Sequence, residues 1–89
     1  MIKAKVTIVN KLGLHARASA KLTKLAGSFK SDVHLTRKDR RVNAKSIMGV
    51  MMLAAGQGSE VEIEVDGIDE QVALDEMTAL IKARFGESE

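Results

Sequence analysis

The sequence has no cysteine, proline, tyrosine or tryptophan, and these absences exclude several kinds of protein. Without cysteine there is neither a disulfide nor a thiolate ligand for a metal. The two histidines, His15 and His34, are too few for a zinc site, so we expect no metal and no cofactor. Only Phe29 and Phe85 are aromatic, so the stacking residues typical of single-strand and RNA-binding proteins are nearly absent.

A long apolar segment is also missing. No run approaches the ~20 apolar residues that span a bilayer. Residues 1–5 lead directly into an alternating pattern and have no signal-peptide features. We therefore expect a cytoplasmic protein without membrane insertion. Its 89 residues can enclose one small core, which predicts a single domain, residues 1–89.

The charge is distributed unevenly along the chain. Residues 1–45 carry twelve of the fourteen Lys and Arg and only two acids, whereas residues 46–89 carry ten acids. This polarity predicts a basic face that attracts an anionic partner or ligand. A small nucleic-acid-binding domain is one alternative. Because the basic residues are spread over several elements and no known binding signature is present, we expect no nucleic-acid partner.

Hydrophobic periodicity predicts a mixed α+β domain. Apolar and polar residues alternate over residues 2–8, 32–36 and 60–65, and residues 41–43 form a further short strand after a polar turn. Three stretches between and after these strands have helical spacing. Since the strands alternate on one face only, we expect a four-stranded antiparallel sheet covered on the other face by three helices, in the order β-α-β-β-α-β-α.

The helix boundaries are predicted from capping residues and from charges that suit the helix dipole. The first helix is expected to begin near Ala16 and to stop at Gly27. Ser46 is expected to cap a second helix over residues 47–54, which Gly56 closes. Asp69 is expected to cap a third helix with Lys82 and Arg84 at its end.

His15 is predicted to lie at the start of the first helix. A helix N-terminus has unpaired N–H groups and a partial positive charge, so it attracts anions and keeps an imidazole neutral and nucleophilic. A phosphoryl group on His15 would be held by the backbone amides of Ala16 and Arg17 and by the Arg17 guanidinium. Further positive charge around the site would come from Lys11, Lys21 and Lys24.

Position alone leaves two interpretations of His15 open. A reactive histidine and an ordinary polar loop residue are about equally compatible with this pattern. His34 is a weaker candidate, because it lies in the middle of a predicted strand on the polar side. We expect His34 to be solvent-exposed and structural.

Two blocks of the sequence resemble one known family. Asn10–Arg17, with the sequence NKLGLHAR, is similar to the active-site segment of the HPr family, the histidine-containing phosphocarriers of the bacterial phosphoenolpyruvate-dependent phosphotransferase system. Asn43–Met51, with the sequence NAKSIMGVM, resembles the regulatory-serine region of the same family. With the element order, the resemblance covers essentially the whole chain, and it implies the open-faced β-sandwich fold.

The resemblance also implies a function. Enzyme I would phosphorylate Nδ1 of His15 with the help of Arg17, and the group would pass to a histidine of an enzyme IIA domain. The protein would then be a monomeric, stoichiometric phosphocarrier and not an enzyme that turns over a substrate alone. A carrier in a regulatory, nitrogen-type branch without sugar transport remains an alternative.

The second block implies regulation and partner binding. In relatives with this block, an HPr kinase/phosphorylase modifies the serine that corresponds to Ser46. The helix that follows is apolar nearly all round, so it is either fully buried or partly an exposed docking surface, for which adaptable methionines are suited. The resemblance favours partial exposure. The residues expected to contact partners are Ala20, Lys24, Ile47, Met48 and Met51.

One position departs from the family pattern. The usual motif has proline directly after the arginine, whereas this chain has Ala18. Proline is favoured in the first helical turn because its φ is preset and its missing N–H would be unpaired there anyway. Alanine accepts the same geometry, so we expect a slightly looser first turn with one additional N–H donor.

Overall fold

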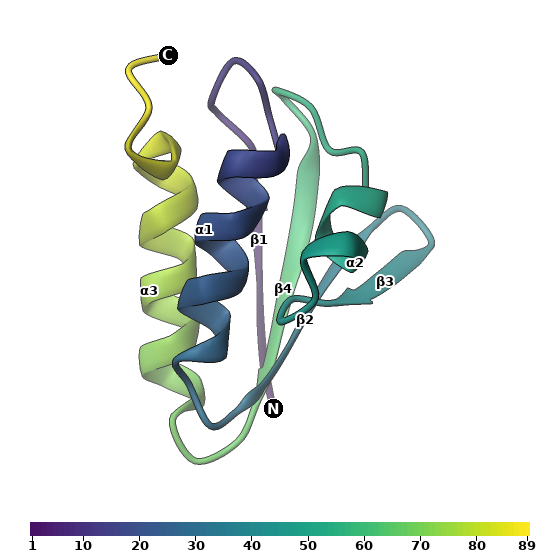
Figure 1. Ribbon diagram of the computed structural model, residues 1–89. Helices are drawn as coiled ribbons and strands as arrows, with labels where there is room; N and C mark the ends of the chain where they lie inside the picture. The colour runs from purple at the N-terminus through teal and green to yellow at the C-terminus, as the bar shows by residue number, and fades with distance from the viewer.

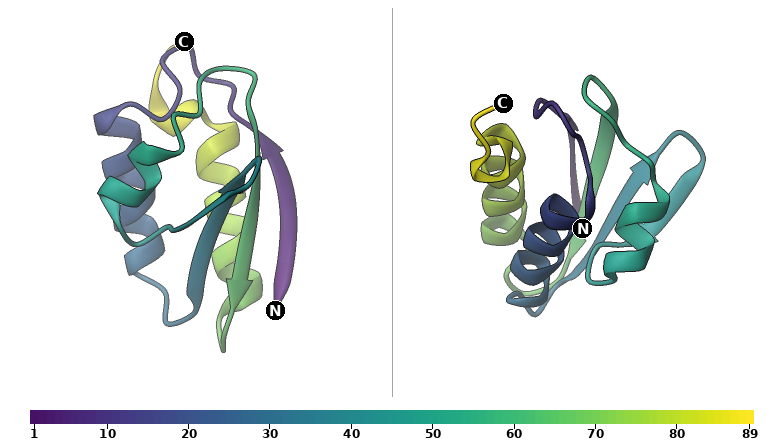
Figure 2. Two further views of the ribbon diagram at one scale, coloured as in Figure 1. Left: turned by 90° about the vertical axis from the view of Figure 1, so that its right-hand side faces the viewer. Right: turned by 45° about the horizontal axis from the view of Figure 1, so that its top comes forward.

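The computed structural model comprises residues 1–89 and confirms the two-layer α+β fold (Figure 1). Its antiparallel sheet has the strand order β1-β4-β2-β3, and the helices lie on one face, as the turned view in Figure 2 also shows. None of these helices is long and apolar enough to cross a membrane. The elements are β1 (Ile2–Thr7), α1 (Ala16–Gly27), β2 (Asp32–Arg37), β3 (Arg40–Asn43), α2 (Ile47–Met52), β4 (Glu60–Asp66), α3 (Glu70–Lys82) and the short turn η1 (Arg84–Gly86).

The alternation of the strands decides which side chains form the core. The apolar residues of β4, Val61, Ile63 and Val65, are all buried beneath the helices. On the outer face the register places Lys3 opposite Glu64. The basic first strand therefore lies beside the acidic fourth strand, and the charge polarity of the sequence partly cancels in space.

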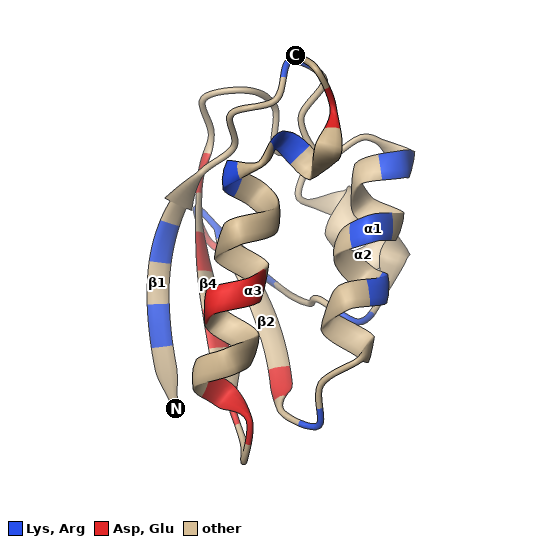
Figure 3. Cartoon of the chain, turned by 90° about the vertical axis from the view of Figure 1, so that its left-hand side faces the viewer, with Lys and Arg blue, Asp and Glu red and all other residues tan.

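Unpaired positive charge remains along α1. Arg17, Lys21 and Lys24 make no ion pair with any carboxylate. Figure 3 shows basic bands along α1, whereas acidic bands lie on β4 and α3. The predicted basic face thus lies in part on the surface of α1, and further cations without an ion pair, Arg37, Lys38 and Arg40, gather at the β2–β3 hairpin.

The first helix ends at Gly27 as predicted, but the second ends differently from the prediction. Gly27 is the last residue of α1, and Ser28 follows with right-handed backbone angles and donates its N–H to α1 carbonyls. Gly56 does not close α2. That helix ends at Met52, and the chain turns at Ala54, whose φ of 51° is left-handed.

The earlier end of α2 has a tertiary cause. Leu53 is buried, which draws the chain towards the core directly after the helix. The guanidinium of Arg37 donates to the Leu53 carbonyl at 3.3 Å, and that of Arg40 donates to the Met52 carbonyl at 3.2 Å. The last carbonyls of α2 are therefore satisfied by the β2–β3 hairpin, which removes the need for a glycine there.

Asp69 stands at the N-cap position of α3, but its side chain does not cap that helix. Its carboxylate instead accepts hydrogen bonds from the backbone N–H groups of Lys30 and Ser31, both at 2.9 Å, and from the Ser31 hydroxyl. These bonds lower the pKa of Asp69 to about 2, and the bond from the Ser31 hydroxyl has the largest effect. The predicted cap is wrong, and Asp69 ties the β4–α3 turn to the α1–β2 loop.

Arg84 lies beyond α3, in a left-handed turn that the sequence pattern did not predict. The φ angles of Arg84 and Phe85 are 58° and 56°. The Phe85 side chain is 1% exposed, so burial of this ring holds the strained turn in place. Its carbonyl accepts a hydrogen bond from Lys21 Nζ at 2.6 Å. The chain that follows passes beside the β1–α1 loop, where the two segments lie together in Figures 1 and 2.

Candidate functional site: His15 at the start of α1

The loop before α1 is fixed by short-range hydrogen bonds. Asn10 is fully buried, and its Nδ2 donates to the Gly13 carbonyl at 2.8 Å. Gly13 has a φ of +64°, and a Cβ there would lie 2.5 Å from the Ala55 carbonyl oxygen. Only glycine fits this contact. Leu14 then donates its N–H to the same carbonyl at 2.9 Å, which fixes the residue immediately before His15.

His15 is the N-cap residue of α1, with an extended backbone (φ −70°, ψ 176°). Its carbonyl accepts the Ser19 N–H at 2.8 Å and so begins the helix. Its imidazole makes no capping bond, and the N–H groups of Ala16 and Arg17 have no acceptor. An uncapped helix N-terminus next to a free ring nitrogen is suited to hold an anion on that ring.

The hydrogen-bond partner of the imidazole comes from the C-terminal tail. His15 Nε2 lies 2.5 Å from Glu87 Oε2, and Asn10 Nδ2 donates to Glu87 Oε1 at 3.0 Å. The hydrogen bond from Asn10, followed by that from His15, holds the pKa of the Glu87 carboxyl below its usual value. The imidazole is thus oriented from one side by an ionised carboxylate.

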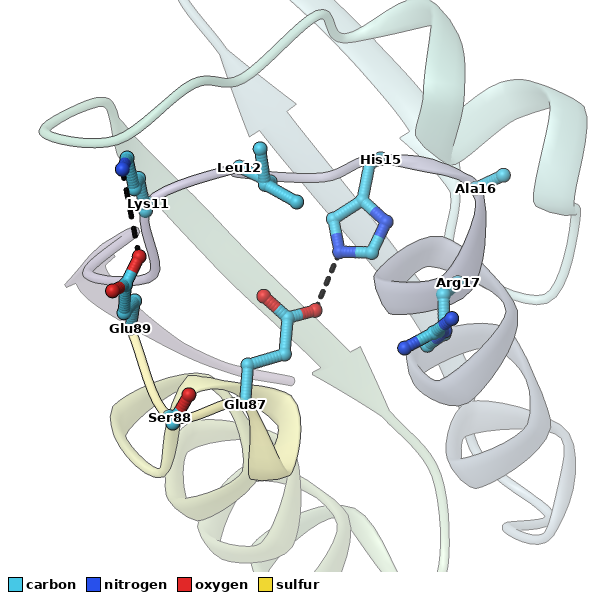
Figure 4. Close-up of a pocket in the computed structure, with 8 residues that line it drawn as sticks. All are labelled: Lys11, Leu12, His15, Ala16, Arg17, Glu87, Ser88 and Glu89. Carbon is cyan, nitrogen blue, oxygen red and sulfur yellow. Dashed lines mark hydrogen bonds and ion pairs between the residues drawn. The ribbon is translucent and has the colours of Figure 1, made fainter.

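His15 and Glu87 line a hollow of about 570 Å³. Figure 4 shows Glu87 reaching one ring nitrogen of His15 while the other, Nδ1, faces the first turn of α1. On the far side of the hollow, Lys11 Nζ pairs with a Glu89 carboxylate oxygen at 3.5 Å. The space admits a phosphoryl group beside His15. Its lining residues are Lys11, Leu12, His15, Ala16, Arg17, Glu87, Ser88 and Glu89.

The structure separates the two histidines as expected. His34 lies on the outer face of β2 and is half-buried, less exposed than predicted. It stands opposite Glu64 and Asn43 in the sheet register. His34 takes no part in the hollow around His15.

The second block forms α2 beside α1. Ser46 caps α2 as predicted, since its Oγ accepts the Gly49 N–H at 3.2 Å, and the residue is exposed. Val50 is buried, whereas Ile47, Met48 and Met51 are 38%, 67% and 40% exposed. The expected partial exposure of these three side chains is confirmed. Ala20 and Lys24 are exposed on α1.

Sequence reasoning missed Glu87 and Asn10. Glu87 belongs to a short acidic tail that looks solvated, and it lies 72 residues from His15 along the chain. No periodicity connects the two positions. The buried Phe85 is the only local signal, because an aromatic residue so close to the end of the sequence indicates that the tail is held against the core.

Comparisons with known proteins agree with the geometry. The family model for the PTS HPr component phosphorylation site matches residues 2–83. Phosphocarrier protein HPr of Cupriavidus necator is 65% identical over 89 residues, covering 100% of both chains. The crystal structure of HPr-C-His from Thermoanaerobacter tengcongensis superposes with a TM-score of 0.96 at 39% identity, covering 100% of both chains. A structure of an HPr dimer from the same organism has a TM-score of 0.79 at 40% identity, covering 98% of this chain and 100% of that chain. The chain therefore belongs to the HPr family, the phosphocarrier proteins of the phosphotransferase system.

Proposed function

We propose that residues 1–89 act as one HPr-like domain in which Nδ1 of His15 accepts a phosphoryl group from enzyme I and passes it to a histidine of an enzyme IIA domain. The observation that carries this proposal is the position of His15. Its Nδ1 faces the uncapped first turn of α1, where the N–H groups of Ala16 and Arg17 have no other acceptor (Figure 4). Phosphoryl transfer depends mainly on positioning and charge stabilisation, so this small site suffices.

Arg17 supplies the charge in this proposal. It is exposed at the rim of the hollow and makes no ion pair, so its guanidinium is available for the phosphoryl oxygens. A charge-assisted, bidentate contact is the interaction that arginine makes best with phosphate. The protein is a carrier that is recharged after each transfer, with phosphohistidine as its covalent intermediate.

The decisive experiment uses enzyme I, phosphoenolpyruvate and intact mass measurement. The wild-type chain should gain one phosphoryl group that is labile in acid, and the His15→Ala variant should gain none. His34→Ala is the matched control and should be phosphorylated like the wild type. An unchanged wild-type mass with an enzyme I that phosphorylates another HPr would refute the proposal.

The docking surface is proposed to combine α1 and α2. Ala20 and Lys24 lie exposed on α1, and Ile47, Met48 and Met51 present apolar surface on the neighbouring α2. Exposed methionines next to an unpaired lysine suit a surface that must fit both enzyme I and enzyme IIA. Association between copies of the carrier is disfavoured by Lys3 and Lys5 on the edge strand β1. We therefore propose a monomer, and a dimeric mass in sedimentation would contradict it.

Ser46 is proposed as a regulatory phosphorylation site for an HPr kinase/phosphorylase. Its hydroxyl is exposed, and a phosphate at a helix N-terminus is electrostatically favourable, so the fold should survive the modification. The added charge would lie beside the apolar docking surface and hinder partners there. Ser46→Asp should lower the rate of His15 phosphorylation by enzyme I while Ser59→Asp does not; equal rates for the two variants would contradict this role.

A further inference from the structure

Glu87 contacts the reactive imidazole on the side opposite to the helix. Its Oε2 lies 2.5 Å from His15 Nε2, and its Oε1 accepts from Asn10 Nδ2 at 3.0 Å. The Glu87 side chain is only 16% exposed. Each carboxylate oxygen therefore has its own donor, and the carboxylate is held in one orientation towards the ring.

Asn10 fixes the orientation of the Glu87 carboxylate from the interior of the protein. The Asn10 side chain is fully buried, and its Nδ2 also donates to the Gly13 carbonyl at 2.8 Å. Because Gly13 belongs to the loop that carries His15, the same amide positions both the loop and the carboxylate. The buried ring of Phe85 anchors the tail two residues before Glu87. The contact thus joins two segments that are each held by the core.

The contact has a consequence for the protonation of the ring. An ionised carboxylate can only accept hydrogen bonds, so the nitrogen that it contacts must carry a proton. In a neutral imidazole one nitrogen is a donor and the other is an acceptor. A donor at Nε2 leaves the lone pair on Nδ1, the nitrogen that faces the first turn of α1 (Figure 4).

We propose that Glu87 is a positioning residue that holds His15 in the Nε2–H tautomer and thereby makes Nδ1 the nucleophile. This inference rests on the proposed function and names the group that selects between the two ring nitrogens. Carboxylates play a similar role beside metal-bound histidines. There one ring nitrogen binds the metal, and the carboxylate accepts the N–H of the other nitrogen and so fixes the tautomer. Glu87 does not touch the phosphoryl group.

The phosphoryl transfer to His15 requires no proton to leave the imidazole. The Nδ1 lone pair forms the new N–P bond, and the bond between phosphorus and the donor breaks with its electron pair leaving on the donor. Nε2 keeps its proton, so the ring of the phosphohistidine becomes an imidazolium. The carboxylate of Glu87, already at Nε2, neutralises this positive charge, and the return transfer restores the neutral ring.

The test is the tautomer of His15 in the unphosphorylated protein, read from its ¹⁵N chemical shifts at about pH 8.5, where an ordinary imidazole is neutral. The wild-type spectrum should show a protonated Nε2 and an unprotonated Nδ1. In Glu87→Ala the two shifts should move towards each other as the tautomers mix. Glu76→Ala removes the same charge from an exposed position on α3 and should reproduce the wild-type spectrum.

Kinetics with enzyme I provide the second readout. Glu87→Ala should lower the maximal rate of phosphorylation about tenfold with little change in KM, because second partners of functional histidines typically contribute tenfold or more. A protonated Nδ1 in the wild type, or identical spectra of wild type and Glu87→Ala, would overturn the inference. Because the spectra need no phosphoryl donor, failure of the proposed function would appear separately, as a normal tautomer in a chain that is never phosphorylated.

Discussion

The N-termini of α1 and α2 begin alike and are used in opposite ways. His15 and Ser46 both have extended backbones at the N-cap position. Ser46 turns its hydroxyl back onto the Gly49 N–H and so stabilises its own helix. His15 turns its ring away and leaves the first amides of α1 open. The difference shows that a helix end can either satisfy its own donors or keep them available for an anion.

The largest expected effect comes from removing the imidazole of His15 at the start of α1. His15→Ala should abolish phosphorylation by enzyme I, because no other side chain at the start of α1 offers a nucleophilic nitrogen. Because the imidazole does not cap the helix and its side-chain partner is Glu87, the variant should lose about as much stability in denaturant as Glu87→Ala does. A clearly larger loss than in Glu87→Ala would mean that His15 itself supports α1, which would contradict the comparison.

The next largest effect is expected at Arg17. Arg17→Ala should slow phosphorylation of His15 roughly 10- to 100-fold, the range for losing a hydrogen bond of about 1.5–3 kcal/mol to a charged group. Arg17→Lys should recover part of the rate, because it keeps the charge but loses the bidentate geometry. Rapid-mixing kinetics with enzyme I measure both variants. Equal rates for Arg17→Ala and Lys38→Ala, a cation in the β2–β3 turn, would argue against the role of Arg17.

At the N-terminus of α2 the expected effect is on stability. Ser46→Ala should cost about 1 kcal/mol, because the Gly49 N–H loses its acceptor, whereas Ser46→Gly should cost only a few tenths. Both values follow from urea denaturation. Phosphorylation of His15 by enzyme I should proceed at nearly the wild-type rate in both variants. A strong loss of transfer in Ser46→Ala would show that the two helix ends are not independent.

The N-terminus of α3 offers a third case, in which the residue at the N-cap position, Asp69, should make the stability of the fold depend on pH. The pKa of Asp69 is lowered from 3.8 to about 2 in the folded chain, first by the Ser31 hydroxyl. A lowered carboxyl pKa stabilises the fold fully above about pH 4, and this contribution is lost as the pH falls through about 2. Asp69→Asn should therefore show a flatter decline of stability between these two values. Ser31→Ala should show an intermediate decline, and parallel curves for all three proteins would contradict the assignment.

Much of the fold follows from patterns within single elements. The alternation in β1, β2 and β4 predicted the one-sided sheet, because each inward side chain must be buried by something on that face. The helix starts at Ala16 and after Ser46 were also correct, since both depend on residues within one turn. The errors lie at Gly56 and Asp69, where contacts with another part of the chain decide the outcome.

The candidate site also has a part that the sequence indicates and a part that depends on contacts between distant segments. His15 and Arg17 could be singled out from the sequence because both lie in one short motif that resembles the HPr active-site segment, although the helix N-terminus alone left the role of His15 open. The partner of His15 could not, because Glu87 reaches the ring only after α3 has packed on the sheet and Phe85 has entered the core. An acidic tail has no periodic signal that indicates where it will lie.

By itself, the sequence determined the strands and the helix starts, because these depend on side-chain periodicity and capping within short segments, and its two motif blocks pointed to His15 as the candidate site. Only the tertiary structure decided how that site is supported. It paired the basic β1 with the acidic β4, left the cations of α1 unpaired, and brought Glu87 to His15. Contacts between segments 72 residues apart are set by the packing of the whole core, and no local pattern encodes them.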